Sequence, residues 1–353
     1  MPAESSVPRT IPGLPHPAVS VVVPCLNESH YLGDLLVSIE RQTYPRDRTE
    51  LIFVDGLSTD STLAILHEFA QRHARTHVLV NPARFVPHAM NIGIREARGD
   101  YIVRLDAHAT YVDNYLETLI SSALALNAEN VGCVFRTATR SQSPKARAIA
   151  FTLAHPLGVG NSLFRIGVHH PTPADTVPFG CYQRKVFDRI GYYDERLIRN
   201  QDIELNRRLR RAGGRIFLLP EIGGTYFCRE TFHQLWNNNW ENGKWVVLTA
   251  AMTNNLSSLS IRHFVPLCFA VYLAAVPVLA IYSSIAFLPL AAYLVAVFSV
   301  TMKHLASHRR AGTALLVAFS FLVLHISYGL GSLASLAHFF RPRRQDDGQH
   351  QTV

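Results

Sequence analysis

Residues 19–55, VSVVVPCLNESHYLGDLLVSIERQTYPRDRTELIFVD, contain one strand–helix–strand unit and decide the fold class. The β-branched run VSVVVP at 19–24 is typical of a buried strand, and ELIFVD at 50–55 repeats that pattern. Residues 28–42 between them have the apolar spacing of a helix. This order predicts two parallel strands with the helix packed on the sheet.

The same alternation continues along the chain. The residues STD at 58–60 are good helix N-caps, and a helical pattern follows them. THVLVN at 76–81 predicts a third strand, VPHAMNIGIREARG at 86–99 a helix ended by Gly99, and DYIVRLD at 100–106 a fourth strand. The series predicts an α/β fold with a mostly parallel sheet and helices on both faces. Ligands of such sheets bind at the carboxyl ends of the strands.

Regular structure is predicted again farther along. A strand is expected near 131–137, whereas residues 138–178 show no clear pattern. NQDIELNRRLRRAGG at 200–214 then predicts a helix, and RIFLLP at 215–220 a strand. These elements belong to one α/β domain, which we place at residues 19–229.

The remaining segments differ from this domain in composition. The stretch before it is rich in proline and has no apolar core, so it is not a signal peptide, and the domain is expected to stay in the cytoplasm. Long, nearly uncharged stretches near the C-terminus are typical of membrane spans of about 20 residues. We expect a flexible leader at 1–18, an amphipathic interfacial helix and linker at 230–260, a transmembrane region at 261–340 with candidate spans 264–282, 284–302 and 313–333, and a basic or polar tail at 341–353.

The net charge of +8 is concentrated beside these apolar segments. The clusters are Arg262 with His263, Lys303–Arg310 and Arg341–Arg344. They indicate a membrane-facing surface, and no nucleic-acid motif is present. If the catalytic part is inside, a helical hairpin returns the chain inside at 303–310, as the positive-inside rule requires. A third span would put 341–344 outside, so either the tail is an exception or one apolar segment does not cross.

Asp55 ends the second predicted strand, where a carboxylate can accept hydrogen bonds from a nucleobase or a ribose. The alternative is a turn-forming aspartate before Gly56. The sequence has neither GxGxxG after a strand nor GxxxxGK[ST], so a bound nucleotide would have its phosphates held by a metal and side chains.

Asp106 and His108 follow the fourth predicted strand. On an extended segment, residues two apart point to the same side, so both side chains could face one cation. Mg²⁺ prefers oxygen ligands and Mn²⁺ tolerates an imidazole. A cation bridging a diphosphate would neutralise the charge that develops as it leaves. The alternative is a capping aspartate beside a surface histidine.

Asp202 begins a predicted helix. Acidic residues are common there because the helix dipole favours them. The functional interpretation is a general base that takes the proton from an attacking hydroxyl. Glu204 is the nearby alternative, but residues two apart on a helix do not share a face.

The chain resembles the family 2 glycosyltransferases with the GT-A fold over about residues 19–220. The matching stretches are VVVPCLNE, LIFVDGLSTDST, AMNIGI, GDYIVRLDAH, VPFGCYQRKVFDRIGYYDE and NQDIELNRRLRRAGGRIFLLPE. The DAH triplet and the apolar C-terminus are more narrowly similar to the ExoA-type membrane glucosyltransferases of succinoglycan biosynthesis.

This resemblance implies an inverting, metal-dependent transfer and a role for each candidate residue. Asp202 would be the catalytic base, and Asp106 with His108 would hold Mg²⁺ or Mn²⁺ at the family's D-x-D position. The residues implied to bind the nucleotide sugar are Pro24, Asn27, Glu28, Asp55 and Asp106. Two departures from the family pattern are His108 in place of the second Asp and Gln201 in place of a Glu.

The implied substrates are a nucleotide-diphosphate sugar, with UDP as the expected nucleotide, and a polyprenyl-linked saccharide. A hexose, glucose being one such sugar, would be transferred in cell-surface or exopolysaccharide biosynthesis. The enzyme would be a multi-pass protein of the bacterial inner membrane with a cytoplasmic catalytic domain, beside other polysaccharide-assembly enzymes. Two alternatives stay open: a polyprenyl-phosphate sugar synthase, and a non-catalytic scaffold with the same fold.

Overall fold

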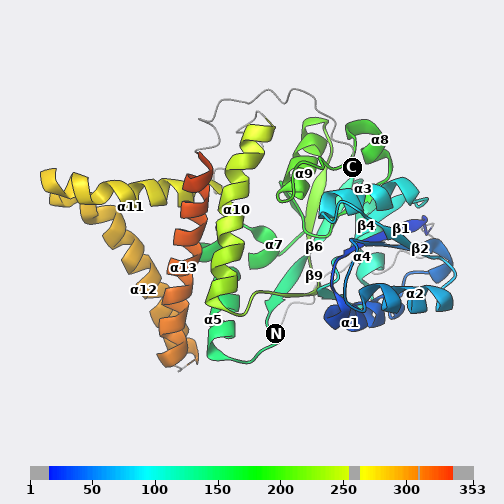
Figure 1. Ribbon diagram of the computed structural model, residues 1–353, viewed down its shortest axis with the longest axis horizontal. Helices are drawn as coiled ribbons and strands as arrows, with labels where there is room; N and C mark the ends of the chain where they lie inside the picture. Colours follow the sequence, from blue (N-terminus) through cyan, green and yellow to red (C-terminus); the bar gives the residue numbers. More distant parts are fainter. Residues whose placement is uncertain (1–15, 254–262, 309–310, 337–353) are drawn as a thin grey trace, which may run out of the picture. The chain divides into compact units, whose positions relative to one another are not determined.

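The computed structural model describes residues 16–253, 263–308 and 311–336, which form two compact units (Figure 1). The first unit comprises the chain up to Arg140 together with Leu153–Cys228, and the second comprises Ser141–Thr152 and the chain from Arg229 onward. Most of the expected leader at 1–18, the end of the linker at 254–260 and the basic tail at 341–353 lie outside the described residues.

The first half of unit one has the predicted α/β alternation. Strands β1, β2 and β3 pair in parallel, and β4 pairs in parallel with β1. The elements are β1 (Val19–Cys25), α1 (Ser29–Glu40), η1 (Arg46–Arg48), β2 (Thr49–Asp55), α2 (Thr62–Arg72), β3 (Thr76–Val80), α3 (Val86–Glu96) and β4 (Tyr101–Arg104). Helix α3 therefore ends at Glu96 and not at Gly99. Gly99 instead lies against β1, where an added Cβ would be 2.6 Å from the Ser20 backbone nitrogen.

The second half of unit one extends the sheet with mixed strand directions. Strand β8 is antiparallel to β4 and β6, and β6 is parallel to β9, which gives the order β3-β2-β1-β4-β8-β6-β9-β5 with β7 paired to β9. The elements are β5 (Ala109–Tyr111), α4 (Tyr115–Ala125), β6 (Asn130–Ala138), α6 (Pro156–Val159), α7 (Leu163–Ile166), β7 (Thr172–Pro173), β8 (Cys181–Gln183), α8 (Lys185–Ile190), α9 (Gln201–Arg211) and β9 (Ile216–Phe227). Strand β9 continues well beyond Pro220, where its predicted pattern ends.

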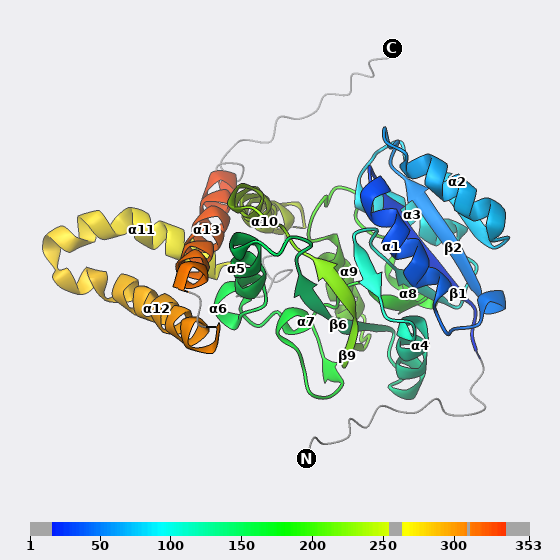
Figure 2. The ribbon, with the colours of Figure 1, turned by 90° about the horizontal axis from the view of Figure 1, so that it is seen from below.

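Two hydrophobic clusters cover the two faces of this sheet. Val21 and Val23 of β1 belong to one cluster with residues of α1, α2 and α4. Val22 faces the other way and packs with residues of α3, α8 and α9. This alternation along one strand confirms the predicted α/β fold with helices on both faces of the sheet (Figure 2).

The second unit is helical, and three of its helices are apolar and long enough to cross a membrane. Those three stretches are Val265–Tyr282, Ser284–Ser307 and Gly312–Leu336, close to the predicted spans. The elements are α5 (Pro144–Leu153), α10 (Phe232–Met252), α11 (Val265–Tyr282), η4 (Ser284–Phe287), α12 (Leu288–His308) and α13 (Ala311–Leu336). Helix α10 begins at a capping box, in which the Thr231 side chain accepts from the Gln234 backbone and the Gln234 side chain accepts from the Thr231 backbone.

Candidate active site

The loops after β1 and β2 are tied together at the carboxyl edge of the sheet. The backbone N–H of Thr59 donates to Asn27 Oδ1 at 2.8 Å, and the Asn27 N–H donates to Ser58 Oγ at 2.9 Å. The Glu28 N–H donates to Thr62 Oγ1 at 2.8 Å. Four of the predicted nucleotide-sugar residues therefore lie on two adjacent strand ends: Pro24, Asn27, Glu28 and Asp55.

Asp55 is almost completely buried at this edge, with 1% of its surface exposed. Its two carboxylate oxygens accept hydrogen bonds from Ser58, one from the backbone N–H at 3.0 Å and one from the hydroxyl at 2.6 Å. These bonds fix the turn after β2, as the turn-forming interpretation predicts. Each oxygen keeps a further lone pair, so a nucleotide contact stays a prediction.

A buried arginine that the sequence analysis missed joins the two candidate catalytic carboxylates. Arg104 is the last residue of β4 and is only 9% exposed. Its Nε donates to Asp106 Oδ1 at 2.8 Å, and its Nη2 to Asp106 Oδ2 at 3.3 Å. Its Nη1 lies 2.8 Å from both carboxylate oxygens of Asp202. Asp106 and Asp202 are thus bridged by the side chain of Arg104, which lies 98 positions before Asp202 in the sequence.

The charge of Arg104 is maintained by these two partners. Burial alone would lower the pKa of Arg104, but the carboxylates of Asp106 and Asp202 outweigh burial and raise that pKa well above its usual value. A buried arginine without partners would be very costly, so its presence in the apolar strand YIVRL was the signal that acids would converge here.

The segment from Asp106 to His108 differs from the expected geometry. It is a turn, not an extended strand, because the Ala109 N–H donates to the Asp106 carbonyl at 3.3 Å. Asp106 contacts Arg104, whereas His108 Nδ1 lies 3.6 Å from Glu28 Oε1. The argument that both side chains share one side of a strand is therefore wrong, although both residues lie at the same edge of the sheet.

The donor chemistry at this edge suits a divalent cation only in part. Within the described residues, no group of three or more His, Cys, Asp or Glu side chains is arranged to hold a metal ion. Asp106 offers carboxylate oxygens and His108 an imidazole nitrogen, a pair that Mn²⁺ accepts. A cation there would take its remaining ligands from a diphosphate and water.

Aromatic rings and two further arginines surround His108. The His108 ring lies 5.6 Å from that of Tyr226 and 6.4 Å from that of Tyr31, measured between ring centroids. Arg165 of α7 lies over the Tyr226 ring, and Arg140 lies over the Tyr31 ring. Both arginines lie within residues 138–178, where no sequence pattern indicated a functional residue. They add positive charge beside the candidate diphosphate site.

Helix α9, which carries Asp202, is fixed by a buried polar network. The Asn130 side chain donates to Asn206 Oδ1 at 2.8 Å, and the Tyr182 hydroxyl donates to the same oxygen at 3.0 Å. The Asn206 amide nitrogen donates to Thr176 Oγ1 at 2.9 Å. Asn206 lies one turn after Asp202 on the same face of the helix, so this network sets the direction of Asp202.

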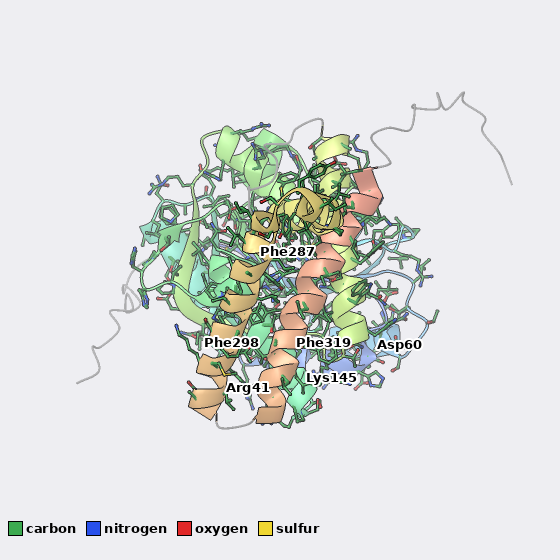
Figure 3. The ribbon with its side chains drawn as sticks, turned by 90° about the vertical axis from the view of Figure 1, so that its left-hand side faces the viewer. Arg41, Asp60, Lys145, Phe287, Phe298 and Phe319 are labelled. Carbon is green, nitrogen blue, oxygen red and sulfur yellow. The ribbon has the colours of Figure 1, made fainter. Side chains whose placement is uncertain are left out.

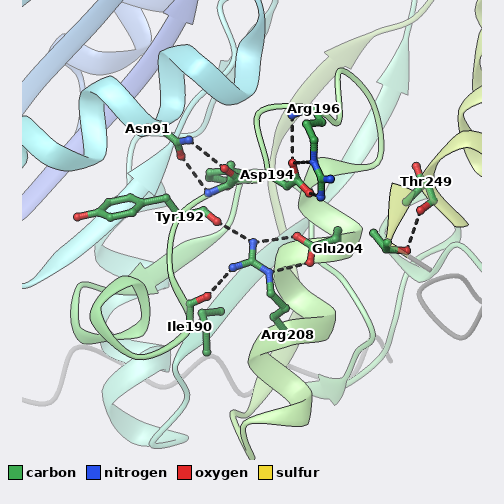
Figure 4. A network of polar contacts seen from close by, with 10 residues as sticks. Asn91, Ile190, Tyr192, Asp194, Arg196, Glu204, Arg208 and Thr249 are labelled. Atoms are coloured by element: carbon green, nitrogen blue, oxygen red, sulfur yellow. Dashed lines mark hydrogen bonds and ion pairs between the residues drawn. The ribbon is translucent and has the colours of Figure 1, made fainter. Parts of the chain in front are cut away.

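Glu204, the alternative base, has a structural role on another face of α9. Its two oxygens accept from Arg208 Nε at 2.7 Å and Nη2 at 2.8 Å. The same guanidinium donates to the carbonyls of Ile190 and Tyr192, which ties α9 to the loop after α8 (Figure 4). Glu204 is directed away from the Arg104 cluster by these bonds.

Two cavities of about 320 Å³ lie away from these acids. One is lined by residues such as Tyr44, His73 and Leu116, and the other by residues at the amino ends of β1, β2 and β3. Neither is lined by Asp55, Asp106 or Asp202. We place the candidate active site where charged groups converge at the carboxyl edge, because ligands of α/β sheets bind there.

A family model described as Glycosyl transferase family 2 matches residues 20–191. The matched stretch runs from β1 to the residue after α8 and includes Asp55, Arg104 and Asp106. Asp202 lies beyond it.

Two curated relatives cover a similar part of the chain. The succinoglycan biosynthesis protein ExoA of Rhizobium meliloti (strain 1021) is 35% identical over 212 residues, which is 59% of this chain and 63% of that protein. The match thus spans less than two thirds of ExoA. A Methanococcus voltae protein, named dolichyl N-acetyl-alpha-D-glucosaminyl phosphate 3-beta-D-2,3-diacetamido-2,3-dideoxy-beta-D-glucuronosyltransferase, is 26% identical over 221 residues, 60% of this chain and 68% of the relative.

One solved structure supports the fold. The mannosyltransferase PcManGT from Pyrobaculum calidifontis, in complex with GDP-Man and Mn²⁺, aligns with a TM-score of 0.58 at 19% identity. The alignment covers 90% of this chain and 88% of that one. Residues 20–191 therefore match glycosyltransferase family 2, and the chain has the GT-A fold.

Proposed function

We propose that this chain is a membrane-bound, inverting glycosyltransferase that moves a hexose from a nucleotide-diphosphate sugar to a lipid-linked saccharide. The observation that carries the proposal is the Arg104 side chain, which holds Asp106 and Asp202 together at the carboxyl edge of the sheet. Asp106 suits the diphosphate end of the donor, which it would contact through a bound cation. Asp202 suits the acceptor, whose proton it would accept.

The exposure of the two carboxylates favours this division. The Asp202 side chain is 36% exposed, against 15% for Asp106. An incoming hydroxyl can therefore reach Asp202, while Asp106 lies deeper beside the strand ends that carry Asn27 and Asp55.

The transfer consists of one displacement in which Asp202 accepts a proton. The acceptor oxygen forms a bond to the anomeric carbon as its proton passes to an Asp202 oxygen. The bond from that carbon to the diphosphate oxygen breaks, and attack from the opposite side inverts the anomeric centre. Arg140 and Arg165 lie where their charge attracts the departing diphosphate. A divalent cation, Mg²⁺ or Mn²⁺, held by Asp106 and His108 would neutralise charge on the leaving group.

The names of two relatives support the substrate classes. ExoA is named for succinoglycan biosynthesis, and the archaeal relative is named for a dolichyl-phosphate-linked sugar acceptor. The fold neighbour was solved with GDP-Man and Mn²⁺. We accordingly propose a UDP-sugar donor, a polyprenyl-linked acceptor and other polysaccharide-assembly enzymes as partners. The location would be the bacterial inner membrane, with several crossings and the catalytic unit on the cytoplasmic side.

The test is the substitution Asp202→Asn in the full chain, assayed in membranes with labelled nucleotide sugars and lipid-linked acceptors. Transfer should be lost, while UDP titrated in the presence of Mn²⁺ should still bind, because Asp202 is not among the proposed nucleotide-binding residues. Asp188→Asn, at an exposed acid of α8, is the matched control and should leave the rate unchanged.

Other outcomes identify the alternatives. Retained turnover in Asp202→Asn would remove Asp202 as base. If bare polyprenyl phosphate is also the preferred acceptor, the chain is a polyprenyl-phosphate sugar synthase, since an anionic phosphate attacks without a base. Failure of the unaltered chain to bind UDP with Mn²⁺ would favour the non-catalytic scaffold.

A further inference from the structure

Helices α11 and α12 form a hairpin that is exposed over nearly its whole apolar surface. Only 11% of the most apolar stretch of each helix is buried. Figure 3 looks onto this side of the protein, with Phe287 and Phe298 labelled. The large apolar side chains that are at least half exposed here are Val265, Val278, Ile281, Tyr282, Ile285, Leu288, Val295 and Phe298.

The hairpin is closed by its own contacts. The Tyr272 hydroxyl of α11 donates to the Ala286 carbonyl at 2.8 Å and accepts from the Leu290 N–H at 3.1 Å. The rings of Phe269 and Tyr293 lie 4.6 Å apart between the two helices. These bonds satisfy backbone groups at the turn, as a segment inserted in hydrocarbon requires.

Helix α13 differs from the hairpin, although its composition is similar. Half of its most apolar stretch is buried in the protein. Its buried polar side chains are Thr313, Ser320, Ser327, Ser332 and Ser335. A helix buried to this extent has a protein partner along much of its length.

The helix with the most extensive contact with α13 is α10, which runs parallel to it. Helix α13 also contacts the hairpin: an added Cβ at Gly329 would lie 2.3 Å from the Pro266 carbonyl oxygen in the first turn of α11, and the Tyr293 hydroxyl of α12 lies 2.9 Å from His325 Nδ1. The Phe232 ring of α10 and the Phe319 ring of α13 are 4.8 Å apart. Farther along both helices, Gly243 lies against Tyr328, whose carbonyl oxygen would be 1.9 Å from an added Cβ. The later contact on α10 is also the later contact on α13, so the two helices run in the same direction. Two views show them side by side (Figures 1 and 2).

The backbones of this pair are in direct contact. An added Cβ at Gly331 would lie 2.1 Å from the Trp240 carbonyl oxygen, and the Ser332 hydroxyl donates to the Gly243 carbonyl at 3.0 Å. Such contact leaves no space for lipid between the helices. The two helices must therefore share one environment.

The polar residues of α10 exclude hydrocarbon as that environment. They lie in the half of α10 that packs on the middle of α13, and they are His233, Gln234, Asn237, Asn238, Asn239, Glu241, Asn242 and Lys244. Of these, His233, Gln234 and Asn237 are exposed. Exposed polar groups and charges at the centre of a bilayer are costly, so a helix of this composition does not cross.

We propose that the α11–α12 hairpin alone crosses the bilayer, and that α13 stays with α10 at the membrane surface on the side where α10 begins. The occupant of the exposed hairpin surface is the hydrocarbon of the lipid. The chain then crosses twice, and Arg341–Arg344 lie on the same side as His263 and Lys303. All the flanking cations then satisfy the positive-inside rule, which three crossings violate.

Cysteine labelling of the full chain in intact bacterial cells tests this topology. Cys268, the exposed cysteine, is first replaced by Ala, since the other four are buried. Ser283→Cys marks the hairpin turn and Ala334→Cys marks the end of α13, both at exposed positions. A membrane-impermeant maleimide should label Ser283→Cys in intact cells and should label Ala334→Cys only after the cells are opened.

Fusions after Val353 provide a second readout that needs no cysteine. A fluorescent protein should be bright there, and alkaline phosphatase should be inactive, because the C-terminus stays inside. An active phosphatase fusion, or labelling of Ala334→Cys in intact cells, would establish a third crossing and overturn the proposal. An unlabelled Ser283→Cys in intact cells would overturn it also, since the hairpin would then not reach the far side. None of these readouts depends on transferase activity.

Discussion

Arg104 is the residue on which the chemistry of this site depends most. It uses three nitrogens on two carboxylates, so the relative position of Asp106 and Asp202 is fixed by one planar group. Lysine has the positive charge but not the planar guanidinium group with its several N–H donors, so it cannot hold both acids in the same geometry. Arg104 acts through its neighbours and is a positioning residue.

We expect Arg104→Lys and Arg104→Gln to lower the kcat for transfer by about 100-fold, because misplaced catalytic groups cost about that much. In both variants the kcat for transfer should fall much more than the KM for the donor changes, because the positions of the two carboxylates are disturbed and not the nucleotide contacts. Arg196→Gln, which breaks a surface pair with Asp194, is the control and should change neither quantity. Wild-type rates in both variants would exclude the positioning role.

His108 is the second proposed ligand of the metal. If its imidazole is a ligand, His108→Ala should weaken Mn²⁺ activation in membranes stripped with EDTA, and His108→Asp should restore it by supplying an oxygen ligand. Metal titrations of transfer rate measure both effects. An unchanged metal requirement in His108→Ala would assign His108 to the acceptor side or to packing against Tyr31 and Tyr226.

At the scale of elements, the contacts of helix α9 with the sheet fix the position of Asp202. Asn206 connects α9 to β6 through Asn130 and to β8 through Tyr182. Asn200, just before the helix, has a positive φ of 62°, which asparagine tolerates better than most residues. Asp202, the proposed base, is thus positioned by buried side chains one turn away and by a backbone bend before it.

We expect Asn206→Leu to lower the free energy of unfolding by about 1–3 kcal/mol, because it leaves buried polar partners unsatisfied. It should also lower kcat for transfer more than it changes KM for the donor. Thermal unfolding in detergent and steady-state kinetics measure the two effects. Arg210→Ala, at an exposed position of the same helix, should leave both unchanged. A loss of stability with full kcat would mean that the network does not direct Asp202.

The α10–α13 pair gives a second prediction at this scale. Gly243→Leu should separate the helices and lower the thermal stability of the full chain, because the Tyr328 carbonyl occupies the space that a side chain needs. Gly312→Leu is the matched control on α13, where an added Cβ meets nothing within 4 Å. Equal melting temperatures for the two variants would contradict the close pairing.

At the scale of the whole molecule, the sequence predicted what depends on local periodicity. Buried strands such as 19–24 and the helices after them follow from apolar spacing, and the apolar C-terminal segments follow from length. The turn at Ala107–His108 was missed because one hydrogen bond overrides a strand-like pattern. The contacts of Arg104 with Asp106 and Asp202 could not be predicted because Asp202 reaches Arg104 only through tertiary structure. Residues 138–178 have no apolar periodicity from which helices or strands could be predicted.

The pairing of α10 with α13 also determines the order in which the parts of the second unit can fold during synthesis. The two helices are separated in the chain by the entire α11–α12 hairpin, so Gly243 cannot contact α13 until Tyr328 has been synthesised. At about 5–20 residues per second, that interval lasts several seconds. The hairpin is available to the membrane throughout this delay, and the helix pair closes only after the middle of α13 has been synthesised. The proposed insertion of the hairpin would thus precede completion of the second unit, and a chain that stops short of α13 would be anchored but unfinished.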